Sequence, residues 1–141
     1  MNQGSTVDIG MLEAALADVV APWVRELGLQ VLAARPGEVE LELPVAPILV
    51  HGGGVLCGQA MMAAADTAMV LAVMTKLGGF KPMTTVQLQT SFLKPVPGDA
   101  GHARLLARVL RMGRSLVFGE ILLQTPRGDL AAHATTTYAL L

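Results

Sequence analysis

Asp66 stands apart from its neighbours in the sequence. It is the one formally charged side chain in the 33 residues from Leu43 to Thr75. No basic residue lies three or four positions from it, so nothing local neutralises it in a helix. Unpartnered carboxylates are costly to bury, and carboxylates in such surroundings collect at functional sites. Asp66 is therefore either a reactive group or a structural carboxylate that hydrogen-bonds a backbone N–H across the core or at a subunit interface.

Gly58 precedes Asp66 by eight residues and stands where a helix is expected to begin. Free N–H groups at a helix start can stabilise a developing oxyanion, and a residue without a side chain lets a carbonyl approach. The alternative role is a helix-entry turn. Eight helical residues cover about 12 Å, so one chain cannot bring both residues to one carbonyl. Two antiparallel copies of the helix across a two-fold axis could do so.

His51 and Cys57 are further candidates near the same helix start. The glycines at 52 to 54 predict a flexible loop, from which His51 could hydrogen-bond a carbonyl or a water, or have no role. Cys57 is either a nucleophile of lowered pKa or a small buried residue. Together with His102 and His133 they do not form a metal-ligand spacing, so no metal is predicted. A P-loop and a serine-hydrolase elbow are absent from the sequence.

Charge is divided unevenly along the chain although the net charge is only -1. Residues 1 to 75 carry about -6 and residues 76 to 141 about +5. Arg111 and Arg114 flank Gly113 in a predicted turn, where they could bind the phosphates of a small polyanion. The basic residues could instead be solvated charges along sheet edges, which suits Arg104 and Arg108. The near-zero net charge and five aromatic residues argue against a nucleic-acid partner.

Hydrophobic periodicity predicts the elements that must position these residues. An amphipathic helix with a bend near Pro22 is expected over 8–27, followed by a hairpin of strands 29–34 and 38–43. An apolar helix, buried nearly all round, should run from 57 or 58 to 76. A meander of strands follows at 83–93, 102–111, 115–124 and 129–140, with Thr85 on the face opposite Leu88. This order predicts an α+β fold in which an antiparallel sheet wraps one helix.

Composition places the chain as one domain, residues 1–141. With 52% hydrophobic and 15% charged residues it is apolar but not disordered. The first twenty residues lack the pattern of a cleaved leader, and Asp66 argues against a membrane span over 55–75. The single cysteine suits a reducing compartment, so a cytoplasmic protein is expected.

Four motifs now bear on the fold and function: A-D-T-A at Ala65 to Ala68, T-x-x-L with F-L-K-P between Thr85 and Pro95, G-R at Gly113, and A-H-A-T-T-T-Y ending at Tyr138. In this order and spacing, residues 38 to 139 resemble the hotdog-fold acyl-CoA thioesterases of the phenylacetate-degradation (PaaI) type. The resemblance implies five or six antiparallel strands around a long helix. It also implies homodimers with active sites at the interface, assembled further as dimers of dimers, and no cofactor.

The same resemblance assigns roles to individual residues. The family's acidic residue lies nine positions after the His of a His-Gly pair, and Cys57-Gly58 holds that place here, while His51 falls on the family's Asn or Gln position. Asp66 is then similar to the general base or nucleophile, and Gly58 to the oxyanion donor. His51 is similar to the polar group at the thioester carbonyl, and Thr85 to the hydroxyl that orients water. Cys57 in place of His and His51 in place of Asn or Gln are departures from the family.

The ligand-binding residues follow from the implied substrate, an acyl-CoA. The basic turn would hold the CoA phosphates, through Arg111, Gly113 and Arg114, and the acyl pocket would be lined by Met61, Met62 and Met69. A hotdog module that binds acyl-CoA without hydrolysing it is the alternative function. A hotdog dehydratase is disfavoured because its His-containing signature is missing.

Overall fold

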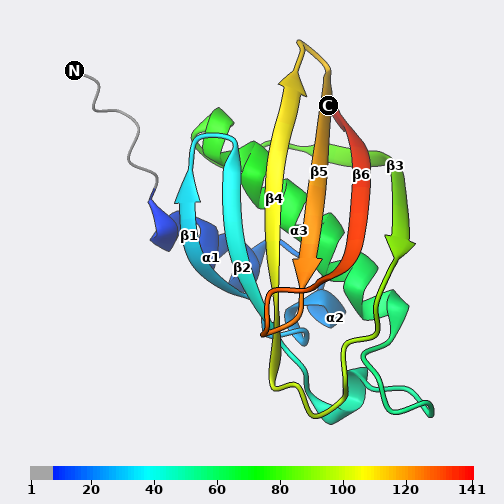
Figure 1. Ribbon diagram of the computed structural model, residues 1–141. Coiled ribbons are helices and arrows are strands. Elements are labelled where there is room, and N and C mark those ends of the chain that lie inside the picture. The colour runs from blue at the N-terminus through cyan, green and yellow to red at the C-terminus, as the bar shows by residue number, and fades with distance from the viewer. Residues whose placement is uncertain (1–7) are drawn as a thin grey trace.

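The sheet is the largest element of the fold. In the computed structural model, which describes residues 8–141, six antiparallel strands form one sheet in the order β1-β2-β4-β5-β6-β3 (Figure 1). The strands are β1 (Gln30–Arg35), β2 (Glu38–Pro44), β3 (Met83–Phe92), β4 (His102–Met112), β5 (Leu116–Gln124) and β6 (Leu130–Leu140). The first seven residues, on which the expectation about a leader partly depends, lie outside the described residues.

The N-terminal helical region is divided into two helices rather than one bent helix. α1 (Ile9–Asp18) ends before the proline, and α2 (Pro22–Arg25) begins on it. Proline lacks an N–H and disfavours a helical residue before it, and Ala21 is accordingly extended with ψ 145°. Leu12 and Leu16 are buried against the core, whereas Trp23 is 62% exposed. Leu27, beyond α2, is buried as well, so the apolar stripe is most exposed at Trp23.

The hairpin and the later strands lie close to their predicted bounds, but their neighbours differ from the predicted meander. β1 and β2 are joined by Pro36-Gly37, where Gly37 has a φ of +79° that favours glycine. Only β4, β5 and β6 form a meander. β3 pairs with β6 at the far edge of the sheet, and β2 pairs with β4. Alternating hydrophobicity reports which face a residue lies on, but not which strand lies beside it.

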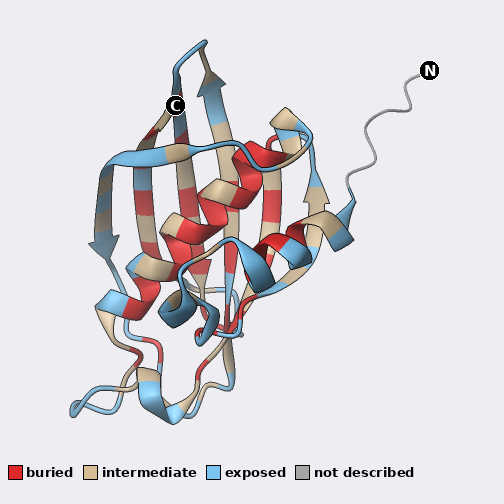
Figure 2. Ribbon diagram, turned by 180° about the vertical axis from the view of Figure 1, so that it is seen from behind, coloured by how far each residue is buried: buried red, intermediate tan, exposed pale blue. Residues whose placement is uncertain are grey.

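α3 (Gly58–Leu77) crosses one face of the sheet diagonally (Figure 2). Its sheet-facing side is buried and rich in alanine, which allows helix and sheet to approach closely. A Cβ added to Gly119 on β5 would lie 2.3 Å from Cε of Met69, so only glycine fits beneath the helix there. α3 is long and apolar enough to cross a membrane by length and composition, but here it forms the core of the fold.

The prediction that this helix is buried nearly all round holds only for part of its circumference. One line of residues is exposed or half-exposed in the single chain: Gln59, Met62, Ala63, Asp66 and Val70. They recur at helical spacing and so share one face. We call these five residues the open stripe of α3. The sheet and α1 leave this stripe uncovered, and it carries the lone carboxylate.

Candidate active site

Asp66 is held by two hydroxyl groups from neighbouring strands. The Thr85 hydroxyl on β3 donates to its carboxylate, with Oγ1 at 3.0 Å from Oδ1 and 3.2 Å from Oδ2. The Tyr138 hydroxyl on β6 contacts Oδ1 closely and lies 3.0 Å from the backbone oxygen of Asp66. Both donors lie opposite one another in the β3–β6 ladder. The carboxylate is thereby oriented on the open stripe without a cationic partner within 4 Å among the described residues.

A one-residue irregularity in β3 brings Thr85 to this position. Thr85 pairs with Tyr138, but Gln87 pairs with Thr137, so Val86 is an extra residue in the ladder. The bulge shifts Thr85 from the face of Gln87 to the helix-facing side. The predicted strict alternation was therefore wrong at this residue, although its assignment to the site came from the resemblance.

Tyr138 is a site residue that sequence reasoning missed. It is 3% exposed, and burial, followed by the charge and hydrogen bonding of Asp66, raises the pKa of its phenol above the usual value. The side chain consequently remains a protonated donor through neutral pH. It ends the A-H-A-T-T-T-Y motif and shares the inward face with Thr136 and Ala134. This alternation could have predicted that Tyr138 points into the core, but it does not indicate a contact between Tyr138 and Asp66.

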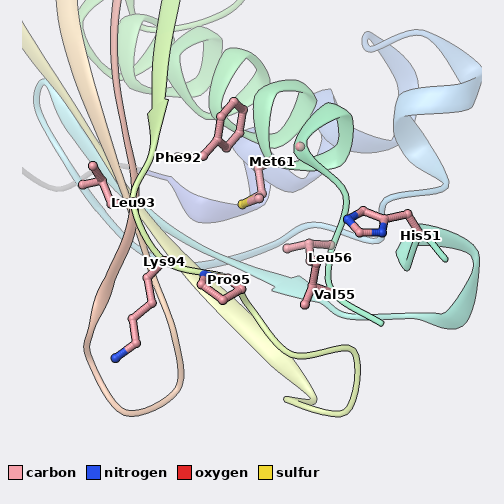
Figure 3. A pocket seen from close by; sticks show the side chains of 9 residues that line it. His51, Val55, Leu56, Met61, Phe92, Leu93, Lys94 and Pro95 are labelled. Atoms are coloured by element: carbon pink, nitrogen blue, oxygen red, sulfur yellow. The ribbon is translucent and has the colours of Figure 1, made fainter. Parts of the chain in front are cut away.

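A second group of predicted residues surrounds the N-terminus of α3. His51, Gly58 and Met61 line an apolar pocket of about 280 Å³ (Figure 3). The other lining residues are Val55, Leu56, Phe92, Leu93, Lys94 and Pro95. Cys57 is the N-cap of α3 but makes no side-chain hydrogen bond to the first turn. The N–H groups of that turn, beginning with Gly58, therefore remain available to an acceptor in the pocket.

Phe92 lies against the start of this helix. A Cβ built on Gly58 would be 3.3 Å from the Phe92 ring, which is a tight contact. The absence of a side chain at Gly58 thus lets the ring approach the first helical turn, where it forms one wall of the pocket.

His51 makes a side-chain hydrogen bond within its glycine-rich loop. The backbone N–H of Gly53 donates to its Nδ1 at 2.8 Å, and a Cβ on Gly53 would lie only 2.7 Å from its Cε1. The loop is further closed by the Gly54 N–H, which donates to the His51 carbonyl at 2.9 Å. Because Nδ1 accepts a hydrogen bond, the neutral ring carries its proton on Nε2. His51 can therefore offer an N–H donor.

The two groups are separate within one chain. Asp66 follows Gly58 by eight residues in a continuous helix, about 12 Å at the helical rise. Thr85 and Tyr138 belong to the Asp66 group, whereas His51 and Met61 belong to the pocket. Each group supplies half of what carbonyl chemistry requires, a carboxylate in one and backbone donors in the other.

The remaining predicted ligand residues lie elsewhere. Met62 belongs to the open stripe, while Met69 is fully buried against Gly119 and does not line the pocket. Arg111 and Arg114 are exposed. With Gly113 they form the β4–β5 turn region, at the opposite end of the sheet from the start of α3 (Figure 1).

A second hollow adjoins the first, and sequence reasoning did not identify it. It has a volume of about 460 Å³, shares Lys94 and Pro95 with the first pocket, and also contains Arg127 and Asp129. Lys94 donates to Asp129 at 2.9 Å, and this hydrogen bond and positive charge lower the pKa of the carboxyl. Within residues 8–141, no cluster of three or more His, Cys, Asp or Glu could hold a metal ion.

Comparison with known proteins identifies the family to which this chain belongs. Residues 53–132 match the thioesterase superfamily. The protein named "Putative esterase TV1331" from Thermoplasma volcanium is 31% identical over 106 residues, which are 75% of this chain and 77% of that protein. The chain belongs to the thioesterase superfamily.

Solved structures agree with this fold. Zebra fish thioesterase superfamily member 2 is 27% identical over 94% of each chain, with a TM-score of 0.80. A hypothetical thioesterase from Streptococcus pneumoniae, solved with coenzyme A, has a TM-score of 0.74 and 18% identity over 80% of this chain and 85% of its own. The hotdog architecture predicted from the sequence is thus confirmed, and the family membership indicates a hydrolase of the thioesterase type.

Proposed function

We propose that this protein hydrolyses acyl-CoA thioesters to a free acid and CoA, in the manner of the PaaI-type enzymes. The observation that carries the proposal is the Asp66 carboxylate, which is oriented by two hydroxyls and is the one charged group on the open stripe of α3. Membership of the thioesterase superfamily supports thioester hydrolysis, and the S. pneumoniae relative solved with coenzyme A supports a CoA-linked substrate. The single cysteine, which is free, suits a reducing cytoplasm.

The proposed catalytic unit is a homodimer. β3 is an edge strand of ten residues, nearly all of them exposed or half-exposed, with one row of backbone groups open for pairing. Two copies joined edge to edge about a two-fold axis would set their α3 helices antiparallel. Each open stripe would then be covered, and Asp66 of one protomer would approach Gly58 of its partner. This arrangement joins the two halves of the site.

The reaction then follows from the two halves. Asp66 takes a proton from a water oriented by Thr85, and the water oxygen attacks the thioester carbonyl. The partner's Gly58 N–H and the Nε2–H of the partner's His51 stabilise the oxyanion. The tetrahedral intermediate expels the CoA thiolate, which takes up the proton that Asp66 removed from the water. In the alternative course Asp66 attacks the carbonyl itself, releases CoA and forms a mixed anhydride that water cleaves.

The substrate would lie along the same dimer interface. The apolar pocket near Met61 and Phe92 suits the acyl group, since its walls are largely hydrocarbon. In the two-fold arrangement, the β4–β5 turn of one protomer comes to the end of the sheet where the partner's α3 begins. Arg111 and Arg114 are then suitably placed to bind CoA phosphates.

A panel of acyl-CoA esters, assayed for thiol release with the wild-type protein and Asp66→Asn, tests the proposal. We expect turnover by the wild type and a loss of about 10³-fold or more in Asp66→Asn, because the amide is neither base nor nucleophile. Unchanged turnover in Asp66→Asn would reject the catalytic assignment. Tight CoA binding without thiol release by the wild type would instead establish the non-catalytic binding module.

A further inference from the structure

Tyr138 makes two contacts with one residue. Its hydroxyl lies 3.0 Å from the backbone oxygen of Asp66 and closer still to Oδ1 of the same residue. A phenol has one proton to donate, and the ionised carboxylate is the stronger acceptor. The hydrogen bond to the carboxylate therefore orients the side chain of Asp66. Together with Thr85, this buried residue determines the direction of the reactive group.

We propose that Tyr138 is a positioning residue that orients the Asp66 carboxylate for attack or proton abstraction. This role rests on the thioesterase function proposed above. Tyr138 and Asp66 are separated by 72 residues in the sequence and meet only because β6 lies beneath the middle of α3. Thr85 on β3 pairs with Tyr138 in the ladder and donates the second hydrogen bond to the Asp66 carboxylate.

The physical basis is a hydrogen bond from a fixed, buried donor. The Tyr138 hydroxyl can donate to the carboxylate only while the phenol keeps its own proton. Burial and the neighbouring charge ensure this by raising the pKa of Tyr138. Among residues 8–141, β6 contributes Tyr138 and β3 contributes Thr85 to the surroundings of Asp66. Neither these strands nor α3 places Lys, Arg or His within 4 Å of the carboxylate.

The contact itself can be tested without any activity, because Tyr138 is the single tyrosine of the chain. Tyrosinate absorbance followed against pH therefore reports this residue alone, with circular dichroism to verify folding. We expect a midpoint above the value of about 10 for free tyrosine in the wild type. Asp66→Asn should lower it, since one cause of the rise is removed. Asp129→Asn, which removes a distant exposed carboxylate, is the matched control and should leave the midpoint unchanged.

The positioning role is tested by Tyr138→Phe, which keeps the buried ring and removes only the hydroxyl. We expect kcat to fall by about tenfold or more with KM within about twofold, as for an interaction that orients the reacting group. Thr136→Val is the control, because it removes another buried hydroxyl from the same strand face, one that donates to the Gln87 carbonyl rather than to Asp66.

The outcomes separate the two proposals. An inactive wild type would reject the proposed function and, with it, the positioning role. An active wild type with an inactive Asp66→Asn and an unaltered Tyr138→Phe would reject the positioning role alone. A tyrosinate midpoint that is the same in the wild type and Asp66→Asn would likewise overturn it, and this measurement requires no substitution at Tyr138.

Discussion

At the scale of single residues, the candidate site depends on side chains whose orientation is set by a neighbour. Asp66 is oriented by Thr85 and Tyr138, and His51 by the backbone of Gly53. A carboxylate or imidazole free to rotate would lose conformational entropy on reaching a reactive geometry. When a neighbouring residue already orients the side chain, this entropy is lost on folding rather than in each catalytic cycle.

Gly53→Ala tests the orientation of His51. The new Cβ would lie 2.7 Å from Cε1, so the ring must turn away and lose the hydrogen bond that holds the proton on Nε2. We expect a fall in kcat of about tenfold, the loss of one aligned donor, with thermal stability nearly unchanged. Thiol-release kinetics measure kcat, and nitrogen-detected NMR of the imidazole reports the tautomer.

Gly52→Ala provides the matched control for that substitution. It lies in the same exposed loop, and a Cβ there meets no atom within 4 Å. We expect its kinetics and imidazole spectrum to match those of the wild type. Full activity in Gly53→Ala, with a displaced ring, would reject a role for His51 at the carbonyl.

At the scale of the element, α3 carries both halves of the candidate site, one at Gly58 and the other at Asp66. Its first turn presents N–H groups to the pocket, and its open stripe presents Asp66 about two turns later. The sheet-facing side can be packed tightly because alanines and Gly119 allow a close approach. The opposite side remains uncovered and is available to a partner.

Gly58→Pro removes the proposed oxyanion donor without disturbing the start of the helix. Proline is favoured at the first helical position, and Cys57 already has the extended conformation required before it, with φ -73° and ψ 149°. We expect kcat to fall by about 10²–10³-fold, the usual cost of losing one oxyanion donor. Steady-state thiol release measures this loss.

Gly58→Ala distinguishes the effect of losing the N–H group from the effect of filling the space at this position. It introduces the same tight Cβ contact with the Phe92 ring but keeps the N–H group. We therefore expect a much smaller loss than in Gly58→Pro. Equal losses in the two variants would show that the pocket needs space at this position and not a donor.

At the scale of the whole molecule, the single chain contains a divided site and an unpaired edge. Asp66 and Gly58 cannot meet within one protomer, whereas β3 offers a long exposed edge beside the open stripe. A partner that pairs with this edge would cover both the stripe and the strand. The dimer is therefore an expected condition of activity and not only of stability.

Mixing two inactive variants tests this shared site. In a dimer of Asp66→Asn with Gly58→Pro, one of the two sites would contain both an intact Asp66 and an intact Gly58. Random assembly should then restore about a quarter of the wild-type activity, because half of the dimers are mixed and each has one complete site. Thiol release from the co-refolded mixture measures this, and each variant alone is the control. No recovery, with mixed dimers verified by mass spectrometry, would place the complete site within one chain.

Local patterns in the sequence determined the elements and indicated several candidate site residues. The apolar run with one carboxylate predicted α3 and Asp66, and alternation predicted the strands within a few residues. These features depend on neighbours along the chain, since side-chain period and intrinsic preference are local properties. The resemblance added a role for Thr85, which periodicity could not supply.

Tertiary structure decided what brings those residues together. The bulge at Val86 turned Thr85 toward Asp66, β3 paired with β6 rather than β4, and Tyr138 reached a residue 72 positions away. Such features are set by the free energy of packing between distant segments, in which a one-residue change of register exchanges the two faces of a strand. Local periodicity does not depend on those contacts. Asp66 could therefore be identified as a candidate from the sequence, whereas its hydrogen bonds with Thr85 and Tyr138 could not be predicted.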